Sequence, residues 1–206
     1  MLYTKIKQEM LPDREKIRIV SEAAGVSPIT AGILLRRGFT DLGQINEFLQ
    51  GKAQPYYDPF LLKGMAAAVD RILLALRQKE KITIYGDYDV DGTTASSLLY
   101  LFLRQEGADV HTYIPRRDTE GYGLNAAALQ KIAQGHTTLL LTVDTGISGA
   151  DVVATAPASM DIIITDHHLA PAQLPKVLAV VNPNQPGDAY PFKGLAGVGV
   201  AFKLCQ

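Results

Sequence analysis

The sequence of 206 residues contains no tryptophan and only one cysteine, Cys205. A single cysteine excludes an internal disulfide, which fits a protein of the reducing cytoplasm. No apolar run approaches the roughly 18 residues of a membrane-spanning helix, and the first residues contain no apolar signal core. The net charge is −1, so the chain lacks the general basic field of many nucleic-acid-binding proteins. We therefore expect a cytoplasmic protein without membrane contact, in which any site for a polyanion is a local patch or lies outside this chain.

The hydrophobic pattern changes along the chain. Residues 1–55 have apolar positions at helical spacing, and a longer helix is predicted over residues 63–78. From Lys81 onward, short runs rich in β-branched residues alternate with helical segments, which predicts an α/β domain with a parallel sheet and helices on both faces. The expected strands lie near residues 81–85, 109–114, 138–143, 161–165 and 177–181, and the expected helices near 93–105, 125–134 and 148–155.

Three of the predicted strands end in clusters of acidic or histidine residues. The clusters are Asp87-Tyr88-Asp89-Val90-Asp91-Gly92, Asp144-Thr145-Gly146 and Asp166-His167-His168. Because the carboxyl ends of parallel strands meet at one edge of a sheet, these side chains can converge on a single crevice. Carboxylates and imidazoles together are suitable ligands for divalent metal ions, and such ions commonly serve phosphate chemistry.

The acidic loop admits several interpretations. As a metal site, its alternating carboxylates would point to opposite sides of an extended segment, with Gly92 opening the next helix. A calcium loop of the EF-hand type requires a glutamate at the twelfth position, where this chain has Leu98. Residues 89–93 also resemble the nucleophile loop of haloacid-dehalogenase phosphatases, although that interpretation leaves the histidine pair unexplained. The plain structural alternative is a solvated acidic turn.

Two other segments give weaker evidence for a binding function. Arg116 and Arg117 follow the predicted strand 109–114, and arginine matches phosphate geometry, although a charged surface loop explains them almost as well. The glycine-rich segment 194–199 does not have the G-x-G-x-x-G spacing and gives little support for a dinucleotide site.

Taken in order, the three clusters resemble the motifs of the DHH phosphoesterase superfamily. Within it, the chain is most similar to the bacterial exonucleases that are specific for single-stranded DNA. The resemblance covers roughly residues 55–206 and includes segments 57–62, 114–117, 120–124, 181–184 and 195–204.

This resemblance implies a two-metal hydrolase, with Mn²⁺ or Mg²⁺, that degrades single-stranded DNA from its 5′ end to mononucleotides in DNA repair and recombination. It implies a single-stranded-DNA-binding protein and a helicase as partners. The implied metal ligands are Asp87, Asp89, Asp91, Asp144 and His167. The implied catalytic residues are Asp144, His167 and His168, with Asp144 between the two ions and Arg117 on a substrate phosphate.

Members of the superfamily have a fourth motif with another metal-binding aspartate, followed by a second, strand-binding domain. This sequence ends before both, so we expect a helical segment over residues 1–55 and an incomplete DHH domain over residues 56–206. We also expect the isolated chain to have little or no activity. Another DHH phosphodiesterase or pyrophosphatase, and a non-catalytic strand-binding module, are the alternatives.

Overall fold

The computed structural model describes residues 13–51, 56–121 and 123–206, which fall into two compact units, Met1–Tyr56 and Tyr57–Gln206. Residues 1–12 and 52–55 of the expected helical segment lie outside the described residues. The first unit contains the helices α1 (Arg14–Ala24), α2 (Pro28–Arg36) and α3 (Leu42–Gln50).

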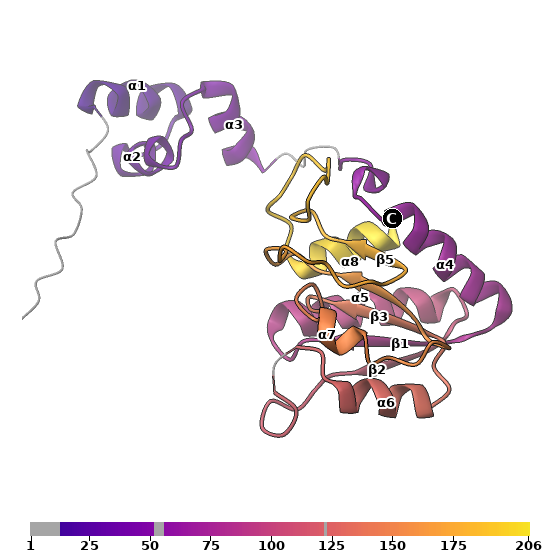
Figure 1. Cartoon of the computed structure of the whole chain (residues 1–206). Coiled ribbons are helices and arrows are strands. Elements are labelled where there is room, and N and C mark those ends of the chain that lie inside the picture. The colour runs from indigo at the N-terminus through magenta and orange to yellow at the C-terminus, as the bar shows by residue number, and fades with distance from the viewer. Residues whose placement is uncertain (1–12, 52–55, 122) are drawn as a thin grey trace, which may run out of the picture. The chain divides into compact units, whose positions relative to one another are not determined.

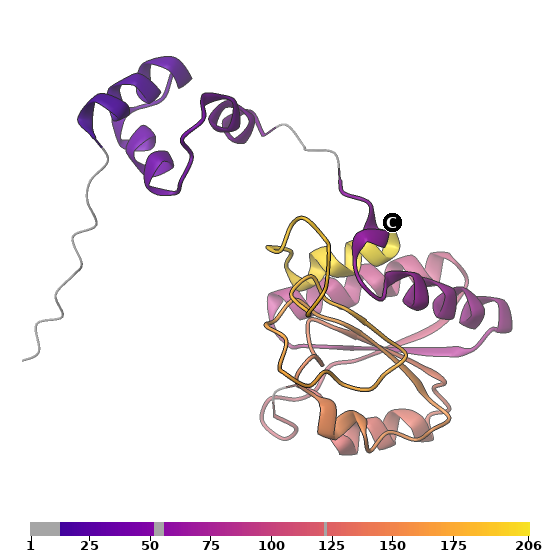
Figure 2. The same cartoon turned by 45° about the horizontal axis from the view of Figure 1, so that its top comes forward.

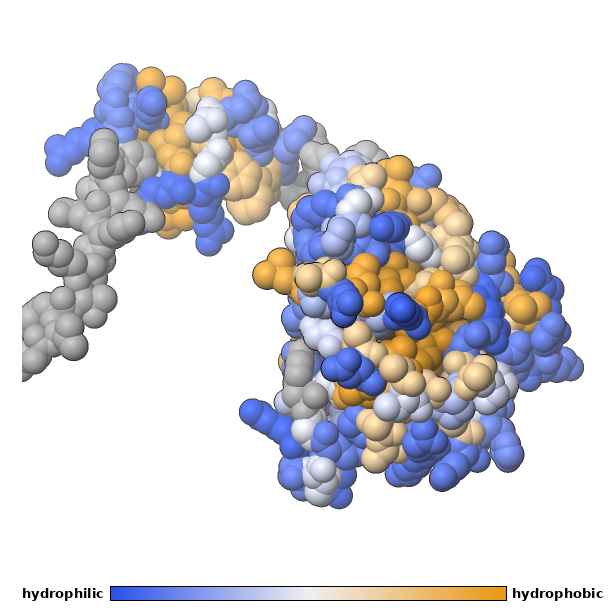
Figure 3. Space-filling model, viewed as in Figure 1, coloured by the Kyte–Doolittle hydropathy of each residue, from blue (hydrophilic) through white to orange (hydrophobic). Residues whose placement is uncertain are grey.

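A small apolar core holds the three helices of the first unit together. It is formed by Val20, Ala31, Leu34 and Ile45. Other large apolar side chains stay on the surface, such as Ile29, which is 77% exposed. Figure 3 shows hydrophobic residues among the hydrophilic ones on the surface of this unit. Among the described residues, no single helix is long and apolar enough to cross a membrane; α1 and α2 together reach that length and composition, but with a bend of 111° between them.

The second unit is an α/β domain with a five-stranded parallel sheet, as predicted. Its strands are β1 (Lys81–Gly86), β2 (Asp109–Tyr113), β3 (Leu139–Val143), β4 (Asp161–Thr165) and β5 (Ala179–Val181). Its helices are η1 (Pro59–Leu61, a 3-10 helix), α4 (Met65–Gln78), α5 (Val90–Gln105), α6 (Ala126–Gln134), α7 (Ala150–Val153) and α8 (Gly197–Cys205).

Helices cover both faces of the sheet. Figures 1 and 2 show α4, α5 and α8 on one face, and α6 and α7 on the other. The alternation of side chains along each strand supplies both cores: Ile82 and Ile84 of β1 pack with the first group of helices, whereas Tyr85 packs on the opposite side. The predicted pattern of buried strands between two helical layers is therefore confirmed.

Two predicted helix boundaries were wrong. The helix expected over residues 148–155 is only the single turn Ala150–Val153. The helix expected from residue 93 begins at Val90, inside the acidic loop, because the side chain of Asp89 caps its N-terminus.

The order of the strands in the sheet is β2-β1-β3-β4-β5. The chain runs outward from β1 to β2 and then returns to the other side of β1 to form β3. In open parallel sheets, such a reversal creates a crevice outside the carboxyl ends of the two central strands, where ligands bind. Here those strands are β1 and β3, which lead into the first two polar clusters of the sequence.

Candidate metal centre

Four polar residues directly follow neighbouring strands at that crevice. They are Asp87 after β1, Asp144 after β3, Asp166 after β4 and Asn182 after β5. The last residues of these strands are partners in the sheet register, so the four polar residues lie at one level of the sheet. Each is at most 3% exposed. Buried polar residues at adjacent strand ends need partners, and the contacts of each define the site.

The acidic loop is not the extended segment that its alternating carboxylates suggested. Oδ1 of Asp89 accepts a hydrogen bond from the backbone N–H of Gly92 at 2.8 Å, which starts α5 at Val90. Asp91 consequently lies in the first turn of α5. Asp87 stays at the end of the strand and is buried, whereas Asp89 is exposed at the helix N-terminus.

Asp91 connects the first turn of α5 to α8. Its Oδ2 accepts from the backbone N–H of Gly197 and its Oδ1 from that of Val198, both at 2.7 Å. The first N–H groups of a helix have no partner within the helix, so this carboxylate satisfies two of them. Each carboxylate oxygen keeps a second lone pair, and Asp91 can therefore still face a cation.

Asp144 lies at the centre of the crevice and is 1% exposed. Its backbone has a left-handed conformation, with φ of 58°, and its N–H donates to the carbonyl of Thr165 at 3.0 Å. Oδ1 is buried and has no hydrogen-bond partner among the described residues. Burial, followed by the charges of Asp91 and Asp89, raises the pKa of Asp144 to about 7. The charge of His168 acts to lower this pKa, but it does not offset burial and the neighbouring carboxylates.

The imidazole of His167 faces two of these carboxylates. Its Nε2 lies 3.1 Å from Oδ1 of Asp144, without the geometry of a hydrogen bond, and 3.5 Å from Oδ2 of Asp91. The side-chain amide of Asn184 donates to the carbonyl of His167 at 2.6 Å and so holds the backbone here. The two carboxylates and the imidazole approach from three different elements of the fold.

Asp166 organises the histidine pair. Its Oδ1 accepts from Nδ1 of His168 at 2.7 Å and from the backbone N–H groups of His167 and His168 at 2.7 and 3.1 Å. Its Oδ2 accepts from the N–H of Ile147 at 2.9 Å, in the loop after β3. Asp166 therefore fixes the loops that follow β3 and β4 relative to each other.

The same carboxylate sets the protonation of His168. Burial lowers the pKa of His168, but the hydrogen bond to Asp166 and the charges of Asp166, Asp144 and Asp87 together raise it by more. An ionised carboxylate only accepts hydrogen bonds, so Nδ1 carries a proton and Nε2 is the ring nitrogen left for a ligand.

Two groups of three side chains can each offer their ligand atoms to one cation. The groups are Asp87, Asp89 and Asp144, and Asp144, His167 and His168; within each, the ligand atoms lie within 4.8 Å of one another. Asp144 belongs to both groups, as a carboxylate shared between two ions would. The unpartnered Oδ1 of Asp144 and the mixture of carboxylates with imidazoles fit Mn²⁺, and the all-carboxylate group also fits Mg²⁺.

Arg117 lies beside the acidic loop. Its guanidinium carbon is 5.6 Å from the centre of the Tyr88 ring, between Asp87 and Asp89 in the sequence. Arg116 instead pairs with Asp118 at 2.9 Å. Of the two arginines, Arg117 is therefore the one that contacts the acidic loop, through the ring of Tyr88.

Three residues support the site although the sequence analysis predicted no role for them. Asn182 donates to the carbonyl of His168 at 3.0 Å, and Asn184 supports His167 in the same way. Gly197 was given no role, yet a Cβ at this position would lie 2.6 Å from Oδ1 of Asp144. The glycine-rich segment 194–199 was the only sequence feature that marked Gly197. In the structure, this glycine allows close packing against a carboxylate and does not form a cofactor site.

The geometry agrees with the comparison to known proteins. The N-terminal domain of the DHH family matches residues 81–206, and the chain belongs to this family. Family membership decides against the haloacid-dehalogenase interpretation of the acidic loop. Among curated proteins, the chain is similar to the single-stranded-DNA-specific exonuclease RecJ of Bacillus subtilis, with 46% identity over 208 residues covering 100% of this chain and 26% of that protein. For RecJ of Thermus thermophilus, the identity is 35% over 199 residues, covering 94% of this chain and 28% of that protein.

Solved structures also show similarity to RecJ exonucleases. The structure of exonuclease RecJ bound to manganese matches with a TM-score of 0.64 and 37% identity, covering 70% of this chain and 37% of that one. The structure of Thermus thermophilus RecJ in complex with Mn²⁺ matches with a TM-score of 0.69 and 31% identity, covering 96% of this chain and 27% of that one. The predicted fold and resemblance are thus confirmed, while the chain spans only about a quarter to a third of the curated relatives it matches.

Proposed function

We propose that this chain is the N-terminal, metal-binding part of a 5′-to-3′ exonuclease that hydrolyses single-stranded DNA to mononucleotides. The observation that carries the proposal is Asp144, a buried carboxylate shared by two potential metal-ligand groups in a chain that is 46% identical to a RecJ exonuclease. Within it, residues 56–206 would form an incomplete DHH domain, preceded by a helical segment over residues 1–55.

The proposed metal ligands for two Mn²⁺ or Mg²⁺ ions are Asp87, Asp89, Asp91, Asp144 and His167. When bound, such ions would neutralise the scissile phosphate and supply an activated water. Asp144 would hold both ions in place, since it belongs to both groups of ligands. His168, oriented by Asp166, would direct Nε2 towards the phosphate, and Arg117 would bind a phosphate of the strand.

The substrate is proposed from the relatives, whose names specify single-stranded DNA. A net charge of −1 gives this chain no general attraction for a polyanion, so we propose that it binds phosphate locally, at the bound cations and at Arg117. We further propose a cytoplasmic role in DNA repair and recombination, together with a single-stranded-DNA-binding protein and a helicase.

The decisive experiment compares Asp144→Ala with Asp151→Ala in the full-length protein, using 5′-labelled single-stranded DNA and Mn²⁺. Asp151 is an exposed carboxylate of α7 outside both ligand groups. We expect Asp144→Ala to lose nearly all cleavage but keep most strand binding, and Asp151→Ala to behave as wild type. Wild-type cleavage by Asp144→Ala would refute the proposed centre. Binding without turnover by the wild-type protein would favour a non-catalytic module, and cleavage restricted to dinucleotides or pyrophosphate another DHH activity.

A further inference from the structure

The loop between β5 and α8, residues 182–196, supports the candidate metal centre at both of its ends (Figure 1). At its start, the buried side chain of Asn182 donates to the carbonyl of His168 at 3.0 Å. Directly after its end, the backbone N–H of Gly197, the first residue of α8, donates to Asp91 at 2.7 Å. The loop therefore connects the histidine side of the site to the carboxylate side.

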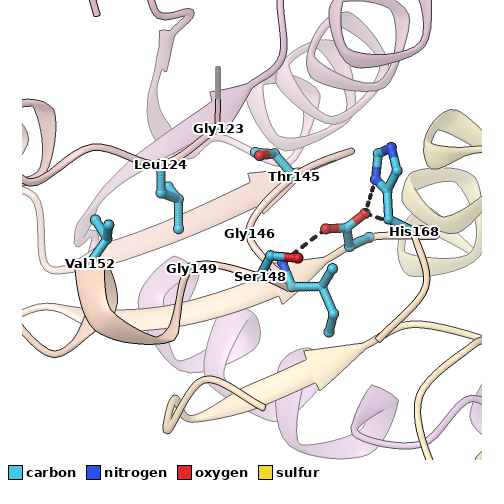
Figure 4. A pocket seen from close by; sticks show the side chains of 10 residues that line it. Gly123, Leu124, Thr145, Gly146, Ser148, Gly149, Val152 and His168 are labelled. Carbon is cyan, nitrogen blue, oxygen red and sulfur yellow. Dashed lines mark hydrogen bonds and ion pairs between the residues drawn. The ribbon is translucent and has the colours of Figure 1, made fainter. Parts of the chain in front are cut away.

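The start of the loop helps to determine where His168 lies. Figure 4 shows the imidazole of this residue at the rim of a pocket of about 270 Å³. Asp166 holds His168 by its ring and by its backbone N–H. Asn182 holds the carbonyl of the same residue, and Asn184 holds that of His167 at 2.6 Å. A shift at the start of the loop would therefore move the backbone of both histidines.

The ammonium group of Lys193 joins the two ends of the loop. Its Nζ donates to the carbonyl of Pro183 at 2.7 Å, and to the carbonyl and Oδ1 of Asp188 at 3.0 and 2.8 Å. An ammonium has three donors, and here each of them has an acceptor. Pro183 directly follows Asn182, and Lys193 lies in the last part of the loop, before Gly197. One side chain thus connects the two segments that support the site.

The connection depends on the charge of Asp188. The side chain of Asp188 is 0% exposed, whereas that of Lys193 is 48% exposed. Oδ1 of Asp188 also accepts from the backbone N–H of Tyr190 at 2.9 Å, and Oδ2 accepts from that of Lys63 at 2.8 Å. Removal of one partner from a buried ion pair is strongly destabilising, because it leaves a buried charge uncompensated. Without the ammonium of Lys193, Asp188 would leave its buried position and the loop would shift.

We propose that Lys193, paired with Asp188, is a positioning residue that keeps the histidine side and the carboxylate side of the candidate metal centre in register. This inference rests on the proposed exonuclease function. Through Pro183 and Asn182, the ammonium fixes the backbone of the histidine pair. Through the end of the loop, it fixes the N-terminus of α8 against Asp91. Its role is to hold other residues in place and not to contact the reacting atoms.

The first test measures this geometry without metal or activity. Lys193→Met keeps most of the length of the side chain but removes the ammonium. Lys63→Met is the matched control, because Nζ of Lys63 donates to Pro186 in the middle of the same loop. In hydrogen exchange of the full-length protein, Lys193→Met should accelerate exchange about tenfold or more in the peptides that contain the backbone N–H groups of His168 and Val198. Lys63→Met should leave both peptides near the wild-type rate.

A chemical rescue separates the ammonium from the rest of the side chain. In Lys193→Cys, the thiolate attacks 2-bromoethylamine and displaces bromide, which builds a lysine analogue with sulfur in place of one methylene. The alkylated variant should regain the wild-type exchange rate. Wild type treated in the same way controls for alkylation of Cys205 and of any further cysteine. Wild-type exchange in Lys193→Met, or fast exchange in Lys193→Cys that persists after alkylation, would overturn the proposal. Lys193→Gln, whose amide keeps two donors, replaces Lys193→Met in the comparison if that variant does not fold.

The second test asks whether the same geometry serves the reaction. At saturating Mn²⁺ and well below the Tm, we expect Lys193→Met to lower kcat on oligo(dT) about tenfold or more and to change KM much less, because displaced metal ligands slow the chemical step. Calorimetry should show weaker Mn²⁺ binding. Wild-type kcat and Mn²⁺ affinity in Lys193→Met would reduce Lys193 to a role in stability alone and overturn the proposal. A wild-type protein that cleaves no single-stranded DNA would contradict the proposed function, and hydrogen exchange would still decide whether Lys193 positions the two sides of the site.

Discussion

Gly197 packs against the carboxylate of Asp144, so closely that a Cβ at position 197 would lie 2.6 Å from both Cβ and Oδ1 of that side chain. The same glycine donates its backbone N–H to Asp91 at 2.7 Å. The N-terminus of α8 is thus held against two potential metal ligands, and only a residue without a side chain fits there.

Gly197→Ala should therefore impair the site more than the fold. The added methyl group would displace Asp144 or push α8 away from Asp91, and displacements of about 1 Å can reduce catalysis by about 100-fold. We expect a loss of that order in cleavage by the full-length protein, together with weaker Mn²⁺ binding by calorimetry. Gly199→Ala is the control on the same helix, because its Cβ would mainly contact the flexible side chain of Leu195, at 3.1 Å. Equal effects of the two variants would show that α8 stability, and not the contact with Asp144, is responsible.

The strand-end acidic residues could be predicted from the sequence because the pattern that defines them is local. Apolar runs identified the strands, and parallel strands necessarily bring Asp87 and Asp144 to the same edge. The contact between Asp91 and Gly197 spans 106 residues, and no local pattern encodes it. The start of α5 is encoded locally, because Asp89 precedes Gly92 at the spacing of an N-cap residue and its partner.

The raised pKa of Asp144 predicts a pH dependence of stability in the absence of metal. Its pKa rises from an ordinary 3.8 to about 7, so the folded state favours the protonated form. The resulting stabilisation is present below the unfolded pKa and is lost as the pH rises through about 7. The free energy of unfolding of the wild type, relative to Asp144→Asn, should therefore fall between about pH 4 and pH 7 in chemical denaturation. A constant difference over this range would show that Asp144 ionises normally.

Mn²⁺ should restore the stability that the metal-free protein loses as the pH rises. A bound cation adds positive charge at Asp144 and must displace the proton, so binding strengthens as the pH rises. We expect the Tm increase caused by Mn²⁺ to be larger at pH 8 than at pH 6. Asp144→Asn should show little increase at either pH. A Tm increase of equal size in this variant would remove Asp144 from the metal site.

Asp166→Asn tests the positioning of His168. The variant keeps the shape of the side chain but removes the charge that raises the pKa of His168, so that pKa should fall. NMR titration of the His168 ring would measure the change, with the exposed His111 as internal reference. We also expect a lower kcat and a shifted pH profile of cleavage in the full-length protein. An unchanged His168 titration would mean that Asp166 only holds the loop after β3 through Ile147.

The two neighbouring arginines allow a matched comparison. Arg117 lies over Tyr88 beside the acidic loop, whereas Arg116 is paired with Asp118. If Arg117 binds a substrate phosphate, Arg117→Ala should raise the KM for single-stranded DNA about tenfold or more and change kcat much less. Arg116→Ala should change either constant by less than about twofold, as expected for an exposed ion pair. Steady-state kinetics on oligo(dT) would distinguish them, and a reversed order of effects would assign the phosphate contact to Arg116.

Residues 1–206 alone should fold but have little or no exonuclease activity. The parallel sheet has a buried core on both faces, and even the last helix contributes Val200 and Ala201, both 0% exposed. One consideration opposes activity. The net charge of −1 gives single-stranded DNA little reason to bind, because neutralisation of phosphates dominates that affinity. Incubation of the purified chain with Mn²⁺ and labelled single-stranded DNA tests this expectation, and circular dichroism verifies folding. Processive digestion that disappears in His167→Ala would show that these residues form a sufficient nuclease.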